Sequence, residues 1–432
     1  MKKILSSNWL MGFIIAIISM VYLNGIAQVP FHPDEQTQIF MSGDLEQLFI
    51  HPYSLFWQPD QHQDLRLRYR ELDPPLTRWI IGIGRMLAGI PAPTVDWDWT
   101  KDWEANQAAG ALPSPHLLVT SRLSVALLFP ISLFLMFQIG KSLGGIPIAW
   151  LNMLALSSNA LVLLHTRRAM AESALLCTAI LTLWAIGQFQ HNTIWLGIPA
   201  ALAFNSKYLN APLMILCLLA IIFQPTKPRQ PTIKVAFQIF QFLFIFMIIT
   251  LALNPFLWNH PWSAIQDAWQ QRNEFVNQQV RTYGYNNPDL VWRTIPERII
   301  GLFINLFINK PAIADVANYI KNTHLAESAY YSNPLTWFSR GVVTGGILII
   351  LTIYGFITAF LRIKRENFNK QRYLGLLWIG TIIQSFALLL FNPLPFQRYV
   401  MPLIPFVCIW MSFGLDSLGR LGILLYRQFR RG

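Results

Sequence analysis

The stretch YLGLLWIGTIIQSFALLLF, residues 373–391, contains 19 residues and no charged side chain. An α-helix of this length crosses the hydrocarbon core of a bilayer, which is about 30 Å thick. Similar stretches recur along the 432-residue chain, of which 54% is hydrophobic and 12% charged. A typical soluble protein has about twice that share of charged residues. The composition therefore excludes a soluble enzyme and predicts an all-α polytopic membrane protein.

Ten segments are predicted to span the membrane, and 193–204 is the shortest of them. The first segment follows Met1-Lys2-Lys3 and resembles a signal peptide, but it is long and has no clear cleavage site. We therefore interpret it as a retained helix. Residues 1–432 are expected to form one membrane-embedded unit. The ten segments are 8–27, 117–139, 145–163, 170–188, 193–204, 208–223, 233–254, 339–361, 373–391 and 399–417.

Positive charge is distributed unevenly between the predicted loops. With the N-terminus in the cytoplasm, 15 cations fall on the inner side, and they face only Glu366 and Asp416. This bias follows the positive-inside rule and places both termini inside a cell or inner membrane. The net charge of +12 then reflects inner loops and anionic lipid, so no nucleic-acid partner is expected. The cations are Lys2, Lys3, Lys141, Lys227, Arg229, Lys234, Arg362, Lys364, Arg365, Lys370, Arg372, Arg420, Arg427, Arg430 and Arg431.

Two long polar segments, 28–116 and 255–337, fall on the outer side. The first contains 12 of the 21 acidic residues, and its apolar residues recur roughly at helical spacing. That spacing predicts short helices lying on the membrane surface. Because loops on a rigid scaffold commonly carry function, we expect the catalytic loop at 28–116. A second outer loop at 255–337 and C-terminal transmembrane helices at 339–417 complete the chain.

The sequence FHPDEQ, residues 31–36, directly follows the first predicted helix. Its adjacent carboxylates, Asp34 and Glu35, have two explanations. Acids in the first turn of a helix cap free N–H groups and complement the helix dipole. Alternatively, a partly desolvated carboxylate acts as the general base for an acceptor hydroxyl. The residues alone leave both explanations open.

Two further patches contain cations on the predicted outer side. In ELDPPLTRW, residues 71–79, the Pro-Pro pair fixes an extended entry into the next helix, and Arg78 is a candidate for holding a phosphate. In HTRRAMAE, residues 165–172, Arg168 and Glu172 have the spacing of an intrahelical ion pair. That pair would leave Arg167 to contact a ligand.

Lys207 and Arg398 are single cations beside apolar segments on the same predicted side. Outer cations run against the positive-inside trend, and charges at the lipid boundary are costly and usually functional. Together with the acids of the first loop, they suit a reaction between a polar acceptor and a lipid-linked phosphate donor.

The order of these motifs resembles that of the GT-C superfamily of integral-membrane glycosyltransferases. The His-Pro-Asp-Glu element, residues 32–35, is similar to the acidic first-loop motif of the superfamily. Asp73-Pro-Pro-Leu-Thr-Arg78 resembles the His-Pro-Pro-Leu-Gly-Lys element of the branch with protein O-mannosyltransferases and undecaprenyl-phosphate aminoarabinose transferases. This chain departs from that element, with Asp in place of His and Arg in place of Lys.

Two later motifs extend the resemblance, which runs from about residue 8 to about residue 410. Arg167 and Glu172 are similar to the Arg-x-x-x-x-Asp/Glu motif of the same branch. Arg398-Tyr399, followed by Pro402 and Pro405, resembles its late Arg-Tyr…Pro…Pro element. Each motif is short, and the order of the four is the specific part.

The resemblance implies an inverting glycosyltransferase that moves a sugar from a polyprenyl-phosphate donor to an acceptor hydroxyl on the outer face. It implies Asp34 as catalytic base, with Glu35 beside it. The expected partners are the lipid-linked donor, membrane lipids and an acceptor that is a protein, a lipid or a glycan. The candidates for the donor phosphate are Arg167, Lys207, Arg398 and Arg78, and the other candidate site residues are His32, Asp73, Glu172 and Tyr399.

No cofactor is expected, because most members of this branch need no metal and the three cysteines lie in apolar segments without a zinc motif. A divalent metal held by His32, Asp34 and Glu35 is the alternative. Two rival functions stay open. A lipid or polysaccharide transporter or flippase would show internal repeats and ionisable groups in the middle of its helices. A non-catalytic membrane subunit of an envelope assembly would not depend on Asp34.

Overall fold

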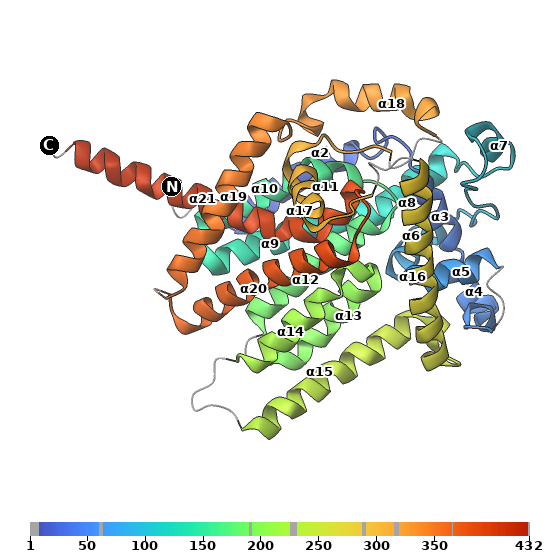
Figure 1. Ribbon diagram of the computed structural model, residues 1–432, viewed down its shortest axis with the longest axis horizontal. Helices are drawn as coiled ribbons and strands as arrows, with labels where there is room; N and C mark the ends of the chain where they lie inside the picture. The colour runs from blue at the N-terminus through green and yellow to red at the C-terminus, as the bar shows by residue number, and fades with distance from the viewer. Residues whose placement is uncertain are drawn as a thin grey trace.

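The computed structural model describes residues 8–59, 64–189, 192–224, 231–286, 291–314, 319–364 and 366–430, and in these residues it contains helices but no strand. A bundle of apolar helices is capped at one end by short helices (Figure 1). Six predicted inner cations, Lys2, Lys3, Lys227, Arg229, Arg365 and Arg431, lie outside the described residues.

A helix lies in each of the ten segments that the sequence predicts to span the membrane. Among the described residues, six helices are long and apolar enough to cross a bilayer, and four apolar helices are shorter. A multi-pass membrane protein is therefore confirmed, whereas the number of crossings stays a prediction. The bundle helices are α2 (Asn8–Asn24), α8 (Pro115–Ala126), α9 (Leu128–Gly144), α10 (Ile146–Ser157), α11 (Ala160–His165), α12 (Ala171–Gln188), α13 (Gly197–Ser206), α14 (Pro212–Ile222), α15 (Thr232–Leu253), α19 (Val342–Ile363), α20 (Phe368–Phe391) and α21 (Ile404–Phe429).

The predicted helix at 145–163 is divided in the structure, so the prediction of one continuous helix is wrong there. α10 ends at Ser157, and the side chain of Asn159 accepts hydrogen bonds from the backbone N–H groups of Leu161 (3.0 Å) and Val162 (3.3 Å). Asparagine favours such caps because its side chain competes for backbone groups. The new helix, α11, then ends close to the polar turn that precedes α12.

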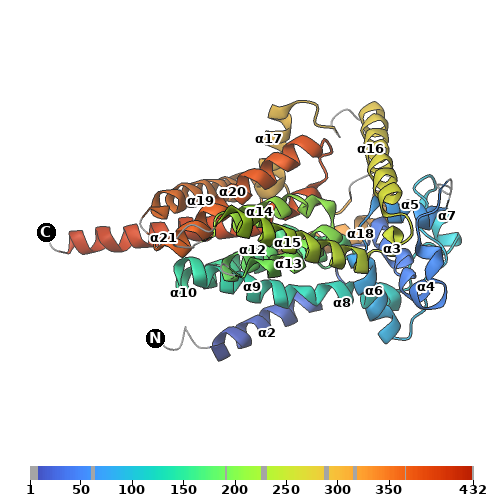
Figure 2. The ribbon, with the colours of Figure 1, turned by 90° about the horizontal axis from the view of Figure 1, so that it is seen from below.

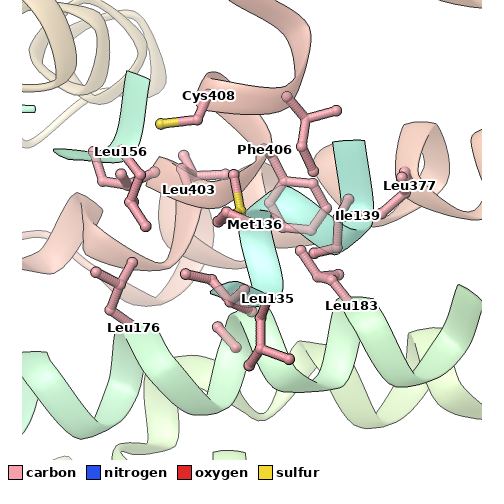
Figure 3. Packing of buried hydrophobic residues seen from close by; sticks show 14 of the residues in the cluster. Leu135, Met136, Ile139, Leu156, Leu176, Leu183, Leu377, Leu403, Phe406 and Cys408 are labelled. Carbon is pink, nitrogen blue, oxygen red and sulfur yellow. The ribbon is translucent and has the colours of Figure 1, made fainter. Parts of the chain in front are cut away.

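The core of the bundle lies where α9, α12, α20 and α21 meet (Figure 3). Leu135, Leu176, Leu377 and Phe406 come from these four helices and are at most 4% exposed. Dense packing of such side chains fixes the helices relative to one another. The core therefore also fixes the ends of the helices, where the polar residues lie.

Close helix contact in the bundle depends on glycine. A Cβ atom added to Gly355 of α19 would lie 1.7 Å from the backbone oxygen of Trp410 in α21. Gly414 of α21 is similarly close to the backbone oxygen of Leu351, at 2.2 Å. Small residues at membrane helix interfaces permit this approach, so α19 and α21 pack backbone to backbone.

The two long polar segments form helices at one end of the bundle, which confirms the short helices predicted in 28–116. The start of α2 and the end of α21 lie at the opposite end from α3–α7 and α16 (Figure 2). We call the end with these helices the loop end. Its helices are α3 (Pro33–Met41), α4 (Asp44–Ile50), η1 (Pro52–Leu55), α5 (Leu65–Leu72), α6 (Leu76–Leu87) and α7 (Trp103–Ala108), then η4 (Pro255–Leu257), α16 (Pro261–Asn286), α17 (Ile295–Phe303), η6 (Ile304–Ile308), α18 (Ile320–Ser332) and η8 (Pro334–Thr336).

Three short turns complete the description. η2 (Thr193–Leu196) precedes α13, η3 (Tyr208–Asn210) follows it, and η9 (Gln397–Leu403) leads into α21. The last two lie at the loop end of the bundle and contact each other. They bring residues that are far apart in the sequence close to α3.

Candidate active site

α3 begins with a capping box that fixes the direction of its first turn. The Nδ1 atom of His32 accepts a hydrogen bond from the backbone N–H of Asp34 at 3.1 Å, and the Glu35 carboxylate accepts one from the backbone N–H of His32 at 3.0 Å. Pro33, whose φ suits the first helical position, follows the cap. Adjacent residues of a helix point about 100° apart, so Asp34 and Glu35 face different surroundings.

Glu35 is fully buried and pairs with Arg122 of α8. Both of its carboxylate oxygens accept hydrogen bonds from the Arg122 guanidinium at 2.7 Å, and the backbone N–H of Ala169 donates a third at 2.9 Å. Burial alone would raise the pKa of Glu35, but the charge and hydrogen bonds of Arg122 outweigh it and hold this pKa below its usual value. Glu35 thus holds α3 against α8, in keeping with a supporting neighbour of Asp34 that orients a helix, and its part in catalysis stays a prediction.

Sequence reasoning missed Arg122, although a signal was available. It is a charged residue inside the apolar segment 117–139, where an unpaired charge would be costly. Its Nη1 atom donates hydrogen bonds to the carbonyl oxygens of Ile26 and Val29, both at 2.8 Å. Arg122 therefore connects the end of α2, the start of α3 and α8.

Asp34 lies on the other side of α3, and its side chain is 31% exposed. It forms an ion pair with the Nη1 atom of Arg398 in η9. The Arg398 guanidinium carbon also lies 5.7 Å from the ring centroids of Phe396 and Tyr399. The structure thus brings together three sequence-predicted site residues: Asp34, Arg398 and Tyr399.

A second ion pair lies beside the first. Lys207, which follows α13, donates a hydrogen bond to Glu172 in the first turn of α12 at 2.6 Å. The Lys207 nitrogen lies 5.4 Å from the ring centroid of Tyr399, and Arg398 interacts with the charge of Glu172. Four chain segments therefore meet in one cluster of two acids and two cations, which we call the ion-pair cluster (Asp34, Arg398, Glu172 and Lys207).

A polar pocket lies along the same face of α3 as Asp34. Thr37, Gln38 and Met41, which are three, four and seven residues after Asp34, line it. This spacing keeps them on one helix face. The side chains nearly close it, and the space between them is too narrow for a water molecule. Its other lining residues are Tyr69, Asp73, Pro74 and Arg78.

Asp96 lies beside this pocket and was not predicted as a site residue. Its Oδ2 atom accepts hydrogen bonds from the Tyr69 hydroxyl at 2.7 Å and from the Thr37 hydroxyl at 3.3 Å. Burial raises the pKa of Asp96 to about 6, and the nearby charge of Asp34 acts in the same direction. No sequence pattern distinguishes Asp96 from the other acids of its loop.

Arg78 and Asp73 border the pocket outside the ion-pair cluster. The Arg78 side chain is 4% exposed; its Nη1 atom lies 3.3 Å from Asp44 Oδ2, and its Nη2 atom donates to the backbone oxygen of Asp73 at 3.2 Å. The Asp73 carboxylate lies 3.8 Å from Arg272 of α16. Burial lowers the pKa of Arg78, and Asp44 opposes that effect. Arg78 is thus held mainly by Asp44.

The predicted ion pair between Arg168 and Glu172 is wrong. α12 begins at Ala171, so both arginines precede the helix. Residues four apart face each other only within a helix, so the spacing of Arg168 and Glu172 does not bring them together. Arg168 instead donates hydrogen bonds to the backbone oxygens of Pro30 (3.3 Å) and Ile313 (2.7 Å). Glu172 is left to pair with Lys207.

Arg167 also differs from the prediction, because it packs against the end of α2. Its Nε atom donates to the backbone oxygen of Tyr22 at 2.9 Å, and its guanidinium lies 4.8 Å from the Tyr22 ring centroid. A Cβ atom at Gly25 would lie 2.5 Å from the Arg167 guanidinium carbon, so the backbone approaches it closely. Arg167 is therefore placed outside the ion-pair cluster.

The residues of the metal alternative do not converge. His32 Nδ1 accepts a backbone hydrogen bond and lies 4.0 Å from Asp34 Oδ2, while Glu35 is turned toward Arg122. Among the residues that the structure describes, no group of three or more histidine, cysteine or acidic side chains is arranged to hold a metal ion. The independence of the protein from cofactors stays a prediction.

Comparison with known proteins identifies the fold through structure rather than sequence. No family model and no curated protein matches the sequence. The crystal structure of the Archaeoglobus fulgidus oligosaccharyltransferase in the apo form is similar, with a TM-score of 0.54 at 10% sequence identity. The similarity covers 98% of this chain and 52% of that one, so this chain spans about half the length of the oligosaccharyltransferase. This chain has the GT-C fold.

Two other solved structures are similar to this chain at lower scores. ArnT from Cupriavidus metallidurans bound to undecaprenyl phosphate has a TM-score of 0.39 at 14% identity, covering 96% of this chain and 78% of that one. The S. cerevisiae protein O-mannosyltransferase Pmt1–Pmt2 complex bound to the sugar donor has a TM-score of 0.35 at 15% identity, covering 56% and 35%. The fold assignment rests on the oligosaccharyltransferase. It confirms the GT-C fold that the motifs predict and leaves the reaction to be argued from the site.

Proposed function

We propose that this GT-C protein is an inverting glycosyltransferase that moves a sugar from a polyprenyl-phosphate-linked donor to an acceptor hydroxyl on the outer face of a cell membrane. The observation that carries the proposal is the ion-pair cluster at the loop end of the bundle. It combines a partly exposed carboxylate, Asp34, with two cations, Arg398 and Lys207. A base and a phosphate site are the two parts that such a transfer requires.

Asp34 is the proposed general base. Its partial exposure lets an acceptor reach it, and the face of α3 that continues from Asp34 to Thr37 and Gln38 is the proposed surface for that acceptor. The acceptor O–H bond breaks as its proton moves to Asp34, and the acceptor oxygen forms a bond to the anomeric carbon. General-base assistance of this kind contributes typically about 10²–10⁴ in rate.

Arg398 and Lys207 are the proposed ligands of the donor phosphate. The bond between the anomeric carbon and the phosphate oxygen breaks, and its electron pair stays on that oxygen. Attack from the opposite side inverts the anomeric centre. Fixed cations stabilise the charge that develops on the phosphate, and they act most strongly where water is excluded. An arginine fork also contacts two phosphate oxygens at once.

The contacts of two other candidates bear on their proposed roles. We leave Arg167 out of the proposed donor site because it packs on Tyr22 and Gly25. Arg78, together with Asp73, lines the pocket and is assigned to the acceptor side. The apolar faces of the bundle helices beside Glu172 and Lys207 are the proposed path of the prenyl chain.

The direct test incubates the purified protein in lipid vesicles with radiolabelled polyprenyl-phosphate-linked hexoses and pentoses and a membrane extract as the source of acceptor. The proposal expects release of polyprenyl phosphate and label in an acceptor product. Both should be lost in Asp34→Asn and kept in Glu46→Gln, a matched carboxylate change at an ion pair with Arg85. Movement of intact donor across the bilayer without cleavage would favour a transporter instead.

The outer location of the site has its own test. Cysteines introduced at Ala108 and Lys364, both exposed, lie in a predicted outer and a predicted inner loop. The three native cysteines are buried and should give little background labelling. An impermeant thiol reagent applied to whole cells should label the first position only. Labelling of Lys364→Cys alone would place the site on the cytoplasmic face.

A further inference from the structure

Both cations of the ion-pair cluster are already paired with carboxylates. Arg398 contacts Asp34, and Lys207 contacts Glu172, so two positive and two negative charges balance. A phosphate that binds to this cluster adds a negative charge to a neutral set. Its strongest contact forms where one of the cations turns from its carboxylate partner to the phosphate.

Burial distinguishes the two pairs. Glu172 is 1% exposed, and separating it from Lys207 would leave a buried carboxylate without its cation, which is strongly unfavourable. Asp34 is 31% exposed, so water can solvate it when Arg398 turns to another anion. Exchange is therefore much less costly at Arg398 than at Lys207.

The Asp34–Arg398 pair also occupies the carboxylate that is proposed as the base. The Oδ2 atom of Asp34 contacts the Arg398 guanidinium, and an acceptor hydroxyl would need the same carboxylate. The contact that holds Asp34 in place thus competes with the role proposed for it.

Building on the proposed function, we propose that Arg398 is shared between Asp34 and the phosphate of the lipid donor, so that donor binding releases the Asp34 carboxylate to contact the acceptor hydroxyl. Linkage requires the reverse effect as well: removing the charge of Asp34 must free Arg398 and tighten phosphate binding. The order of binding then matters, since an acceptor that arrives first meets a carboxylate that Arg398 still holds.

The test measures binding of undecaprenyl phosphate, which carries the phosphate but no sugar, to the purified full-length protein in nanodiscs. Asp34→Asn should tighten binding about tenfold or more, within the usual range of coupling between sites. In the double variant with Arg398→Ala, the Asp34→Asn change should neither tighten phosphate binding relative to Arg398→Ala alone nor restore the wild-type affinity, because the shared partner is gone. Glu46→Gln removes a carboxylate of similar exposure, 26%, from a pair with Arg85 and should leave the affinity unchanged.

Three results would overturn the proposal. Unchanged or weaker binding by Asp34→Asn excludes the sharing of Arg398 while leaving the glycosyltransferase assignment intact. Equal tightening with and without Arg398 shows simple charge repulsion between Asp34 and the phosphate. If the wild-type protein binds no undecaprenyl phosphate, the donor class itself is wrong, and the proposed function fails together with this inference.

Discussion

Helix α3 separates two regions that contain the same chemical groups in different surroundings. On one side, Glu35 and Arg122 form a pair that is 0% and 2% exposed. On the other side, Asp34 and Arg398 form a pair that is 31% and 11% exposed. The first pair also accepts and donates backbone hydrogen bonds, through Ala169, Ile26 and Val29.

The difference shows that burial decides what an ion pair does. Removing one partner from a buried pair leaves an uncompensated charge, so such a pair is permanent and structural. A pair that reaches water separates at little cost, so its members are available to substrates. The two adjacent acids, Asp34 and Glu35, are thus expected to have different roles. Four substitutions test this comparison.

The largest effect is expected for Asp34→Asn on the exposed side. The amide keeps the shape of the carboxylate and removes the proton acceptor, so turnover should fall by roughly 10²–10⁴. The free energy of unfolding should change by less than about 1 kcal/mol, because the lost pair is partly exposed. Initial rates with the lipid donor and thermal melts of the same sample measure both quantities. Near-normal turnover would reassign Asp34 to capping α3.

The buried side should respond in the opposite way. Glu35→Ala leaves Arg122 buried without its carboxylate, and we expect a loss of about 3–5 kcal/mol in stability. Glu104→Ala removes an exposed acid of the same loop and should cost less than about 0.5 kcal/mol. Denaturation of both variants in detergent provides the comparison. A well-folded Glu35→Ala protein with only its turnover reduced would contradict the structural role.

A smaller effect is expected from Asp96, the buried acid on the pocket side. Its folded-state pKa, about 6, lies above the usual value of 3.8, so the folded protein binds this proton more tightly than the unfolded chain. Protonated Asp96 therefore contributes to the free energy of unfolding below about pH 4, and this contribution is lost as the pH rises through 6. About two pH units correspond to roughly 3 kcal/mol at most. The melting temperature of the wild type minus that of Asp96→Asn should decrease between pH 4.5 and 7. A difference that does not change with pH would exclude the raised pKa of Asp96.

The smallest effect concerns Arg167. Arg167→Ala removes a hydrogen bond to the Tyr22 backbone and a contact with its ring, which together should cost about 1–2 kcal/mol in stability. Turnover of the folded variant should remain within about threefold of wild type. Arg398→Ala is the comparison, since it removes a cation from the ion-pair cluster. A turnover loss as large as that of Arg398→Ala would return Arg167 to the donor site.

Local properties of the sequence predicted most of the fold. A long apolar stretch without charge specifies a membrane helix wherever it lies, so helices occur in all ten predicted segments. The predicted helix at 145–163 is divided at Asn159, and this division has a local cause too. One capping side chain ends the helix in a segment that is apolar on average. Arg122 shows the limit of the apolar pattern, because its partner Glu35 lies 87 positions away.

The candidate site was predicted less completely, because its contacts are not local. The motifs selected Asp34, Glu172 and Arg398, the charge pattern selected Lys207, and the structure places these four together. Their catalytic roles stay predictions. Which acid pairs with which cation depended on the start of α12 at Ala171, and a spacing rule for helices does not apply before a helix begins. Asp96 reaches the pocket through Tyr69 and Thr37, contacts that no motif encodes.

The 364 positions between Asp34 and Arg398 also have a consequence for biosynthesis. As the chain leaves the ribosome, Asp34 is inserted with the first helices, while Arg398 is made only when most of the sequence has been translated. A growing chain thus holds half of this ion pair. Under the proposed function, we expect activity only after α21 has entered the membrane, and we expect any truncation before η9 to remove it however well the remainder folds.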